Sequence, residues 1–288
     1  MNSPALSAAF DRADALPDAT ARSTPRSERL SAALLRGAAV FWFTLTAAGQ
    51  LLFACYVALF YGRAVAHGRL EEWNKVLQGG YIAGDTLGNS ALVSHLLFAV
   101  IITVGGVLQL LPVVRRRWPR LHRWNGRVYL TGASIAALGG LVMIWTRNGG
   151  GDLSQHVAIS INALLILTFA ALALRHALAR RLDVHRRWAL RLFLVVSGGW
   201  FFRVGLMFWI VVNHGPVGFD PKTFTGPFLT GLSFAQFLLP LALLELYLHA
   251  QRGSAGARIG VAAVLIVLTL AMTGGIAAAA AIMWLPHM

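Results

Sequence analysis

Four histidines recur at nearly equal offsets in this apolar chain, and imidazole is a side chain that ligates iron. The offset from His95 to His156 is nearly the same as the offset from His122 to His185. Each histidine stands at the N-terminal end of one of four consecutive apolar segments. Because neighbouring membrane helices run antiparallel, His95 and His156 should lie near one membrane face and His122 and His185 near the other. The spacing therefore predicts two pairs of facing imidazoles, an outer pair and an inner pair.

Two imidazoles on opposite sides of a haem iron leave no open position, so such a haem carries electrons instead of binding oxygen. We therefore expect two b-type haems, with the four histidines as the iron ligands. Haem propionates need cationic partners. The candidate cofactor-binding arginines are Arg123, Arg127 and Arg191 for the inner pair and Arg203 for the outer pair.

The same residues allow other interpretations. Histidines near membrane boundaries also anchor headgroups, so interfacial anchoring or a role without haem is an alternative. A charge buried in the membrane is costly, and Arg203 has Asp85 or Asp152 as an alternative partner. Glu245 stands at a depth similar to that of Arg191 and is a candidate to neutralise it.

Polar amide side chains inside the apolar segments are expected to bond across helices, at about 0.6 kcal/mol each on average. Three residues belong to this group: Gln109, Asn162 and Gln236.

Seven apolar segments of the chain are long enough to cross a membrane. Hydrophobic residues make up 57% of the sequence and charged residues 12%, whereas a soluble domain has about 25% charged residues. A bilayer core is about 30 Å thick, so roughly 20 apolar residues span it as a helix. Lipid offers no partner to exposed backbone groups, which favours helices. We therefore predict an all-α membrane protein with seven transmembrane helices, at 37–61, 91–113, 128–146, 154–174, 188–213, 227–250 and 259–285.

Arginine gathers in alternate connections of the chain: before the first segment, between the second and third, between the fourth and fifth, and between the sixth and seventh. By the positive-inside rule, these connections face the cytoplasm. We expect a bacterial inner-membrane protein with a cytoplasmic N-terminus and an external C-terminus. The net charge of +14 then faces anionic membrane lipid, and nucleic acid is not an expected partner.

The second to fifth segments predict a four-helix core built from two parallel hairpin repeats, over 91–213. One copy runs from His95 to Arg127 and the other from His156 to Arg191. In both, His-Arg, then tryptophan, then arginine follow the basic connection. Residues 1–30 lack an apolar period and predict a disordered cytoplasmic tail, which leaves 31–288 as the seven-helix domain.

The stretch from His95 to Arg203 carries the patterns HRxxGRxY, beginning at His122, and HRxWxxR, beginning at His185. On these motifs, the stretch resembles an uncharacterised bacterial family of multi-pass membrane proteins, the domain of unknown function 2306. That resemblance implies no activity or cofactor. The histidine placement also looks like the cytochrome b561 type, which implies two haems that move electrons across the membrane. The histidines here lie nearer the helix ends, and seven helices replace the usual six.

Patterns of other enzyme classes do not occur: the chain has no Walker loop, zinc motif, nucleophile elbow or dinucleotide-binding glycine pattern, and no catalytic side chain is predicted. The leading hypothesis is a transmembrane electron carrier with two b-type haems, an oxidoreductase if it is an enzyme. The sequence does not indicate the electron donor or acceptor. The alternative is a non-redox multi-pass membrane protein, such as a small transporter or an assembly factor.

Overall fold

The computed structural model describes residues 26–77, 80–146 and 151–288, and within them every regular element is a helix. In chain order these are α2 (Arg26–Ala66), the 3-10 helix η1 (Leu70–Lys75), α3 (Thr86–Leu110), α4 (Pro112–Arg117), α5 (Pro119–Thr146), α6 (Leu153–Leu178), α7 (Leu182–Val196), α8 (Gly198–Val212), α9 (Pro227–Ala250), α10 (Ala255–Ala279), the π-helical turn η2 (Ala280–Trp284) and the 3-10 turn η3 (Leu285–His287). The predicted all-α membrane class is confirmed.

Six helices of the described residues are each long and apolar enough to cross a membrane: α2, α3, α5, α6, α9 and α10 with its short continuation. The pair α7 and α8 passes the same test when taken as one span, bent by 50° at a short break. The count thus reaches the predicted seven only with the bent pair as the seventh.

The prediction of a continuous fifth helix over 188–213 is wrong, because the chain breaks at Ser197 between α7 and α8. The hydroxyl of Ser197 donates to the carbonyl of Phe193 at 2.7 Å, and the N–H of Trp200 donates to the carbonyl of Ser197 at 3.0 Å. A serine that bonds back in this way bends helices, and the two glycines that follow lower helix stability. The residues of the break are therefore its cause.

The first helix also begins earlier than predicted. The apolar pattern placed its start at residue 37 and a disordered tail up to residue 30, but α2 is helical from Arg26. Residues 26–30 are therefore helical, and the tail prediction for 1–25 lies outside the described residues.

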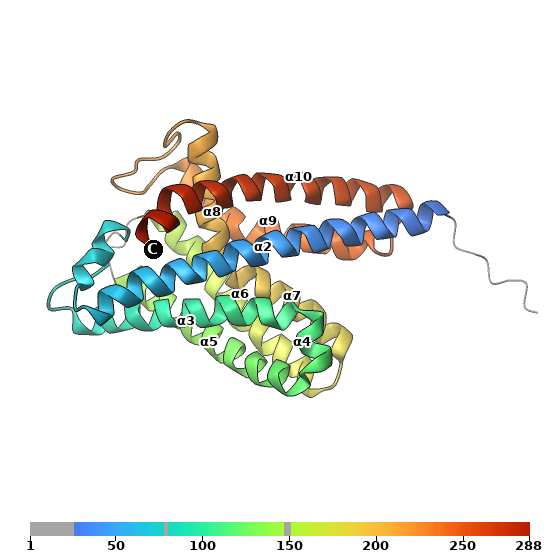
Figure 1. Cartoon of the computed structure of the whole chain (residues 1–288), viewed down its shortest axis with the longest axis horizontal. Coiled ribbons are helices and arrows are strands. Elements are labelled where there is room, and N and C mark those ends of the chain that lie inside the picture. The colour runs from blue at the N-terminus through green and yellow to red at the C-terminus, as the bar shows by residue number, and fades with distance from the viewer. Residues whose placement is uncertain (1–25, 78–79, 147–150) are drawn as a thin grey trace, which may run out of the picture.

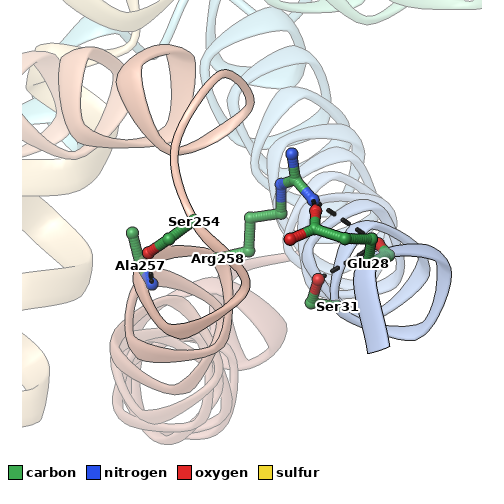
Figure 2. Close-up of polar contacts among 5 residues, drawn as sticks. All are labelled: Glu28, Ser31, Ser254, Ala257 and Arg258. Carbon is green, nitrogen blue, oxygen red and sulfur yellow. Dashed lines mark hydrogen bonds and ion pairs between the residues drawn. The ribbon is translucent and has the colours of Figure 1, made fainter. Parts of the chain in front are cut away.

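Two helices far apart in the sequence, α2 and α10, lie side by side along the length of the molecule (Figure 1). At one end Arg258 forms an ion pair with Glu28, whose carbonyl accepts from Ser31, and Ser254 caps α10 at the N–H of Ala257 (Figure 2). At the other end the guanidinium of Arg63 bonds the carbonyl of Met288. The two helices therefore run parallel, and Arg26 and Met288 lie at opposite ends of the bundle.

One buried cluster joins α3, α5, α6, α7 and α9, through residues such as Ile102, Tyr129, Ala158, Leu192 and Phe237. It therefore contains all four helices of the predicted four-helix core together with α9. The duplication of a hairpin within that core stays a prediction.

A second buried cluster, which we call the outer aromatic cluster, lies near the C-terminal ends of α2 and α10. Its large members are Tyr56, Tyr61, Trp73, Trp200 and Trp284. They come from α2, η1, α8 and η2, so the segment after α2 folds back onto the bundle through Trp73, which is buried.

Candidate functional site

The two inner histidines occupy equivalent places on two helices. His122 is the fourth residue of α5 and His185 the fourth residue of α7. Each helix follows a short basic turn, and Pro119 begins α5 at a position that suits proline, since the first helical N–H has no acceptor. The two imidazoles lie within range of electrostatic interaction. The two rings are therefore close enough to influence each other electrostatically, and their pairing at one cofactor stays a prediction.

Neighbouring helices contact the ring of one of these histidines and the backbone of the other. Nδ1 of His185 lies 2.9 Å from the carbonyl oxygen of Ala173 on α6. Because a carbonyl only accepts, the proton belongs on Nδ1, which leaves the lone pair of Nε2 free for a ligand. Gln109 of α3 donates to the backbone carbonyl of His122 at 2.8 Å, and Nδ1 of His122 is buried without a hydrogen-bond partner among the described residues.

The donor set limits what such a pair can hold. In the described part of the chain, no group of three or more His, Cys, Asp or Glu side chains gathers as a metal site. A bare ion at the inner pair would thus have two protein ligands. A haem iron suits two imidazoles better, because the porphyrin supplies its other four ligands.

The predicted arginine partners fall into two groups. Arg123, together with Arg115, acts electrostatically on His122, and the guanidinium of Arg127 lies over the ring of Trp124, 5.3 Å from its centroid. Arg191 is instead bound by Glu245 of α9, with Nε–Oε1 at 2.7 Å and Nη2–Oε2 at 3.0 Å. The alternative proposed for Arg191, neutralisation by Glu245, is confirmed.

The outer histidines both lie against α5, but at different heights. Cε1 of His95 is 3.9 Å from where a Cβ on Gly140 would stand, whereas the His156 ring meets the Trp145 ring edge-on at 5.6 Å between centroids. Within the described residues, no interaction joins His95 to His156.

The two outer histidines also stand at different distances from their helix starts. His156 is the fourth residue of α6, but His95 is the tenth of α3, because α3 begins at Thr86 and not at the predicted residue 91. Their contacts on α5, Gly140 and Trp145, are five residues apart, which corresponds to about 7.5 Å along that helix. The sequence did not predict this difference in depth, and the membrane face of the two outer histidines stays a prediction.

Arg203 on α8 lies between His95 and the outer aromatic cluster. Its guanidinium donates to the carbonyl of Gly199 at 2.8 Å, lies 5.5 Å from the centroid of the Phe53 ring, and interacts electrostatically with His95, Tyr56 and Tyr61. The acids proposed as its alternative partners cap helices. Asp85 accepts from the N–H of Gly88, and Asp152 accepts from the N–H of Gln155 and from Thr230.

Amide side chains supply contacts between helices. Gln109 bonds α5 as described, and Nδ2 of Asn162 donates to the carbonyl of Val195 on α7 at 3.1 Å, so these two predictions are confirmed. The prediction for Gln236 is wrong, since its amide donates to Ser233 of its own helix. Sequence reasoning missed Asn125, whose amide donates to the carbonyl of Gly105 on α3 at 2.8 Å. Its place inside an apolar helix was the available signal.

Comparison with known families gives one match. The sequence model of a family described as "Predicted membrane protein (DUF2306)" matches residues 92–239. The matched stretch contains all four candidate histidines and Arg203. No curated protein and no solved structure matches the chain.

Proposed function

The chain belongs to the DUF2306 family of predicted membrane proteins, and on that premise we propose that it is a transmembrane electron carrier with a b-type haem held by His122 and His185. Fold and composition make it a multi-pass membrane protein. The family description carries no activity, so the proposal rests on the residues themselves.

One observation supports the proposal: two histidines that are far apart in the sequence lie within range of electrostatic interaction, each at the fourth residue of its helix. The Ala173 carbonyl orients one of them with a free Nε2, and the other has an unpaired buried nitrogen. A backbone carbonyl on the far ring nitrogen is the usual way in which a protein orients a metal-binding histidine. The donor set of the inner pair therefore fits a haem.

A bound haem would supply reversible one-electron chemistry there. The protein would hold the iron through two imidazoles, and Arg115 and Arg123 would favour negative charge beside His122. Arg127 is a further candidate for a propionate, whereas Arg191 is bound to Glu245.

A second haem between His95 and His156, with Arg203 beside it, would complete the transmembrane hypothesis, and it requires one of the two imidazoles to move to the depth of the other. Its support is the nearly equal spacing of the two pairs and the electrostatic contact of Arg203 with His95. Electrons would pass between a donor and an acceptor at opposite faces of a bacterial inner membrane. The basic turns before α5 and α7 would face the cytoplasm.

The visible spectrum of the detergent-purified full chain, before and after dithionite, tests the proposal. We expect a reduced b-type band that His185→Ala removes in part or completely. His249→Ala is the matched control, since His249 is exposed near the C-terminal end of α9 and lies outside the pair; it should leave the band unchanged. A folded protein without the band when purified from haem-replete cells would refute the proposal.

A second candidate, a non-redox transporter, has support from the break between α7 and α8. Discontinuous membrane helices form the substrate sites of many transporters. Here Gln50 of α2 donates to the Ser197 hydroxyl at 2.9 Å, and Oδ1 of Asn162 is buried without a partner among the described residues. Ser197 lies about 22 Å along the helix axis from the start of α7.

Water access to the break separates the two candidates. In a Cys55→Ser background, Ser197→Cys should resist a water-soluble maleimide in membranes if the break is only a packed bend. Rapid labelling together with a spectrum free of haem would favour transport.

A further inference from the structure

The end of α4 and the first turns of α5 form two hollows beside each other. Arg120, Arg123, Trp124 and Arg127 line the first hollow. The second hollow is lined by Arg117, Trp118, Pro119, Arg120 and Leu121. Arg120 therefore lines both. We call this surface the α4–α5 double hollow.

The double hollow presents positive charge with no acidic side chain in its lining. Within the described residues, Arg117, Arg120, Arg123 and Arg127 take part in no ion pair, and the guanidinium of Arg127 stacks over Trp124. Guanidinium groups bind phosphate oxygens through paired N–H donors. The chemistry that fits this surface is phosphate.

Apolar side chains continue directly from the arginines. Trp118 is 54% exposed and Trp124 is 65% exposed. From Trp124 an exposed apolar stripe runs along α5 toward its C-terminal end, through Val128, Ile135, Leu138 and Val142. A free phosphate or a nucleic acid has no use for such a stripe, whereas acyl chains lie along apolar helix faces and tryptophan lies at headgroup level.

We propose that the α4–α5 double hollow binds a phospholipid whose headgroup carries two phosphates. One phosphate lies between Arg120 and Arg117, and the other lies between Arg120 and the pair Arg123 and Arg127. Binding the first phosphate raises the effective concentration of the second at its own hollow. A headgroup with one phosphate fills only half of the surface.

Native mass spectrometry of the purified full chain tests this inference. The chain is exchanged into nanodiscs of phosphatidylcholine with either a four-chain, two-phosphate lipid or phosphatidylglycerol, at equal negative charge. We expect at least about fivefold higher retention of the two-phosphate lipid, and no displacement by millimolar pyrophosphate. Equal retention of the two lipids would overturn the two-phosphate assignment, and displacement by pyrophosphate would overturn the lipid assignment.

A matched pair of variants locates the site. Arg120→Gln removes the arginine shared by both hollows, whereas Arg116→Gln removes the same charge from the same turn but lines neither hollow. One cation near an anionic surface is worth roughly a fivefold change in binding. We expect Arg120→Gln to lower retention of the two-phosphate lipid by at least about fivefold and Arg116→Gln to lower it by less than about twofold.

Equal losses in the two variants would show a diffuse surface charge and overturn the inference. If Arg120→Gln does not fold, Arg117→Gln and Arg123→Gln each remove an arginine from one hollow. Each should then reduce the preference for the two-phosphate lipid over phosphatidylglycerol, and an unchanged preference in both would overturn the inference. The haem spectrum of Arg120→Gln and Arg117→Gln is a separate readout, because neither arginine is placed beside the proposed haem.

Discussion

Polar contacts connect the helices at the end of the bundle that holds His122 and His185, which we call the inner end, whereas aromatic packing connects them at the opposite end, which we call the outer end. At the inner end, the amide of Gln109 bonds the backbone carbonyl of His122, and the carbonyl of Ala173 accepts from the ring of His185. The guanidinium of Arg191 bonds the carboxylate of Glu245. At the outer end, the ring of Tyr61 meets the ring of Trp73 edge-on, with 5.7 Å between the ring centroids. The indole N–H groups of Trp73, Trp200 and Trp284 are buried there without partners among the described residues. The inner end is therefore arranged around its histidines, and the outer end around its aromatic residues.

The difference shows what places two membrane residues at one depth. His122 and His185 come the same number of residues after a helix start, and their imidazoles lie within range of electrostatic interaction. His95 and His156 lie on helices of similar direction but at unequal distances from their starts. Equal sequence spacing therefore brings two side chains together only where the helix starts are also equivalent.

Replacing each histidine singly should give the largest effects and tests this comparison directly. We expect His122→Ala and His185→Ala to remove the same share of the reduced absorption band, because both imidazoles serve one site. His95→Ala and His156→Ala should differ from each other, because the two contact α5 about 7.5 Å apart along its axis. Equal losses for the outer two, measured as band area per protein, would contradict the difference between the two ends.

The outer end should respond most strongly to a change in packing. A Cβ at Gly275 would collide with the carbonyl of Val204, where α10 crosses α8, whereas one at Gly274 would stand 3.6 Å from the Phe208 ring. Overpacking typically costs about 1–3 kcal/mol, so Gly275→Ala should lower the free energy of unfolding by at least about 1 kcal/mol. Gly274→Ala should be neutral, and denaturant titration of both purified variants checks the contrast.

At the inner end, the ion pair between α7 and α9 should contribute less. The Arg191 side chain is 20% exposed and that of Glu245 is 51% exposed, and pairs in water are worth up to about 1 kcal/mol. A double-mutant cycle of Arg191→Gln and Glu245→Gln should give a coupling of roughly 1 kcal/mol in unfolding free energy. If the effects of the two single substitutions on the unfolding free energy simply add, the ion pair contributes nothing to stability.

The smallest expected effect lies at the break that separates the two ends. Ser197→Ala removes the bond from Gln50, and hydrogen bonds between membrane helices are worth about 0.6 kcal/mol on average. Ser134→Ala is the control, since the Ser134 hydroxyl bonds only Leu130 of its own helix. We expect a small loss of unfolding free energy for Ser197→Ala and none for Ser134→Ala. An equal change in both variants would contradict a stabilising bond between Gln50 and Ser197.

Apolar length and the arginine distribution were enough to predict the helical membrane class and the positions of most spans. The break at Ser197 was not predicted, because a glycine pair inside a membrane helix also occurs at plain packing contacts. The equivalent places of His122 and His185 on their helices could be predicted from spacing, because each comes soon after a basic segment, whereas a shared ligand stays a prediction.

The depth of His95 was beyond sequence reasoning for a physical reason. Residues 86–90 are polar enough to predict a loop, yet the Asp85 carboxylate caps the N–H of Gly88 and starts α3 there. Likewise, Glu245 was named as a partner for Arg191 from depth alone, while Asn125 was passed over although its amide joins α5 to α3.

The number of haems per chain tests the central claim most directly. Haem is extracted and quantified against protein for the wild-type chain, His122→Ala, His185→Ala and the double variant. Because both imidazoles serve one haem, each single variant should lose one equivalent, and the double variant should lose the same single equivalent. Two lost equivalents in the double variant, or wild-type haem content in any of the three, would contradict a haem shared by His122 and His185.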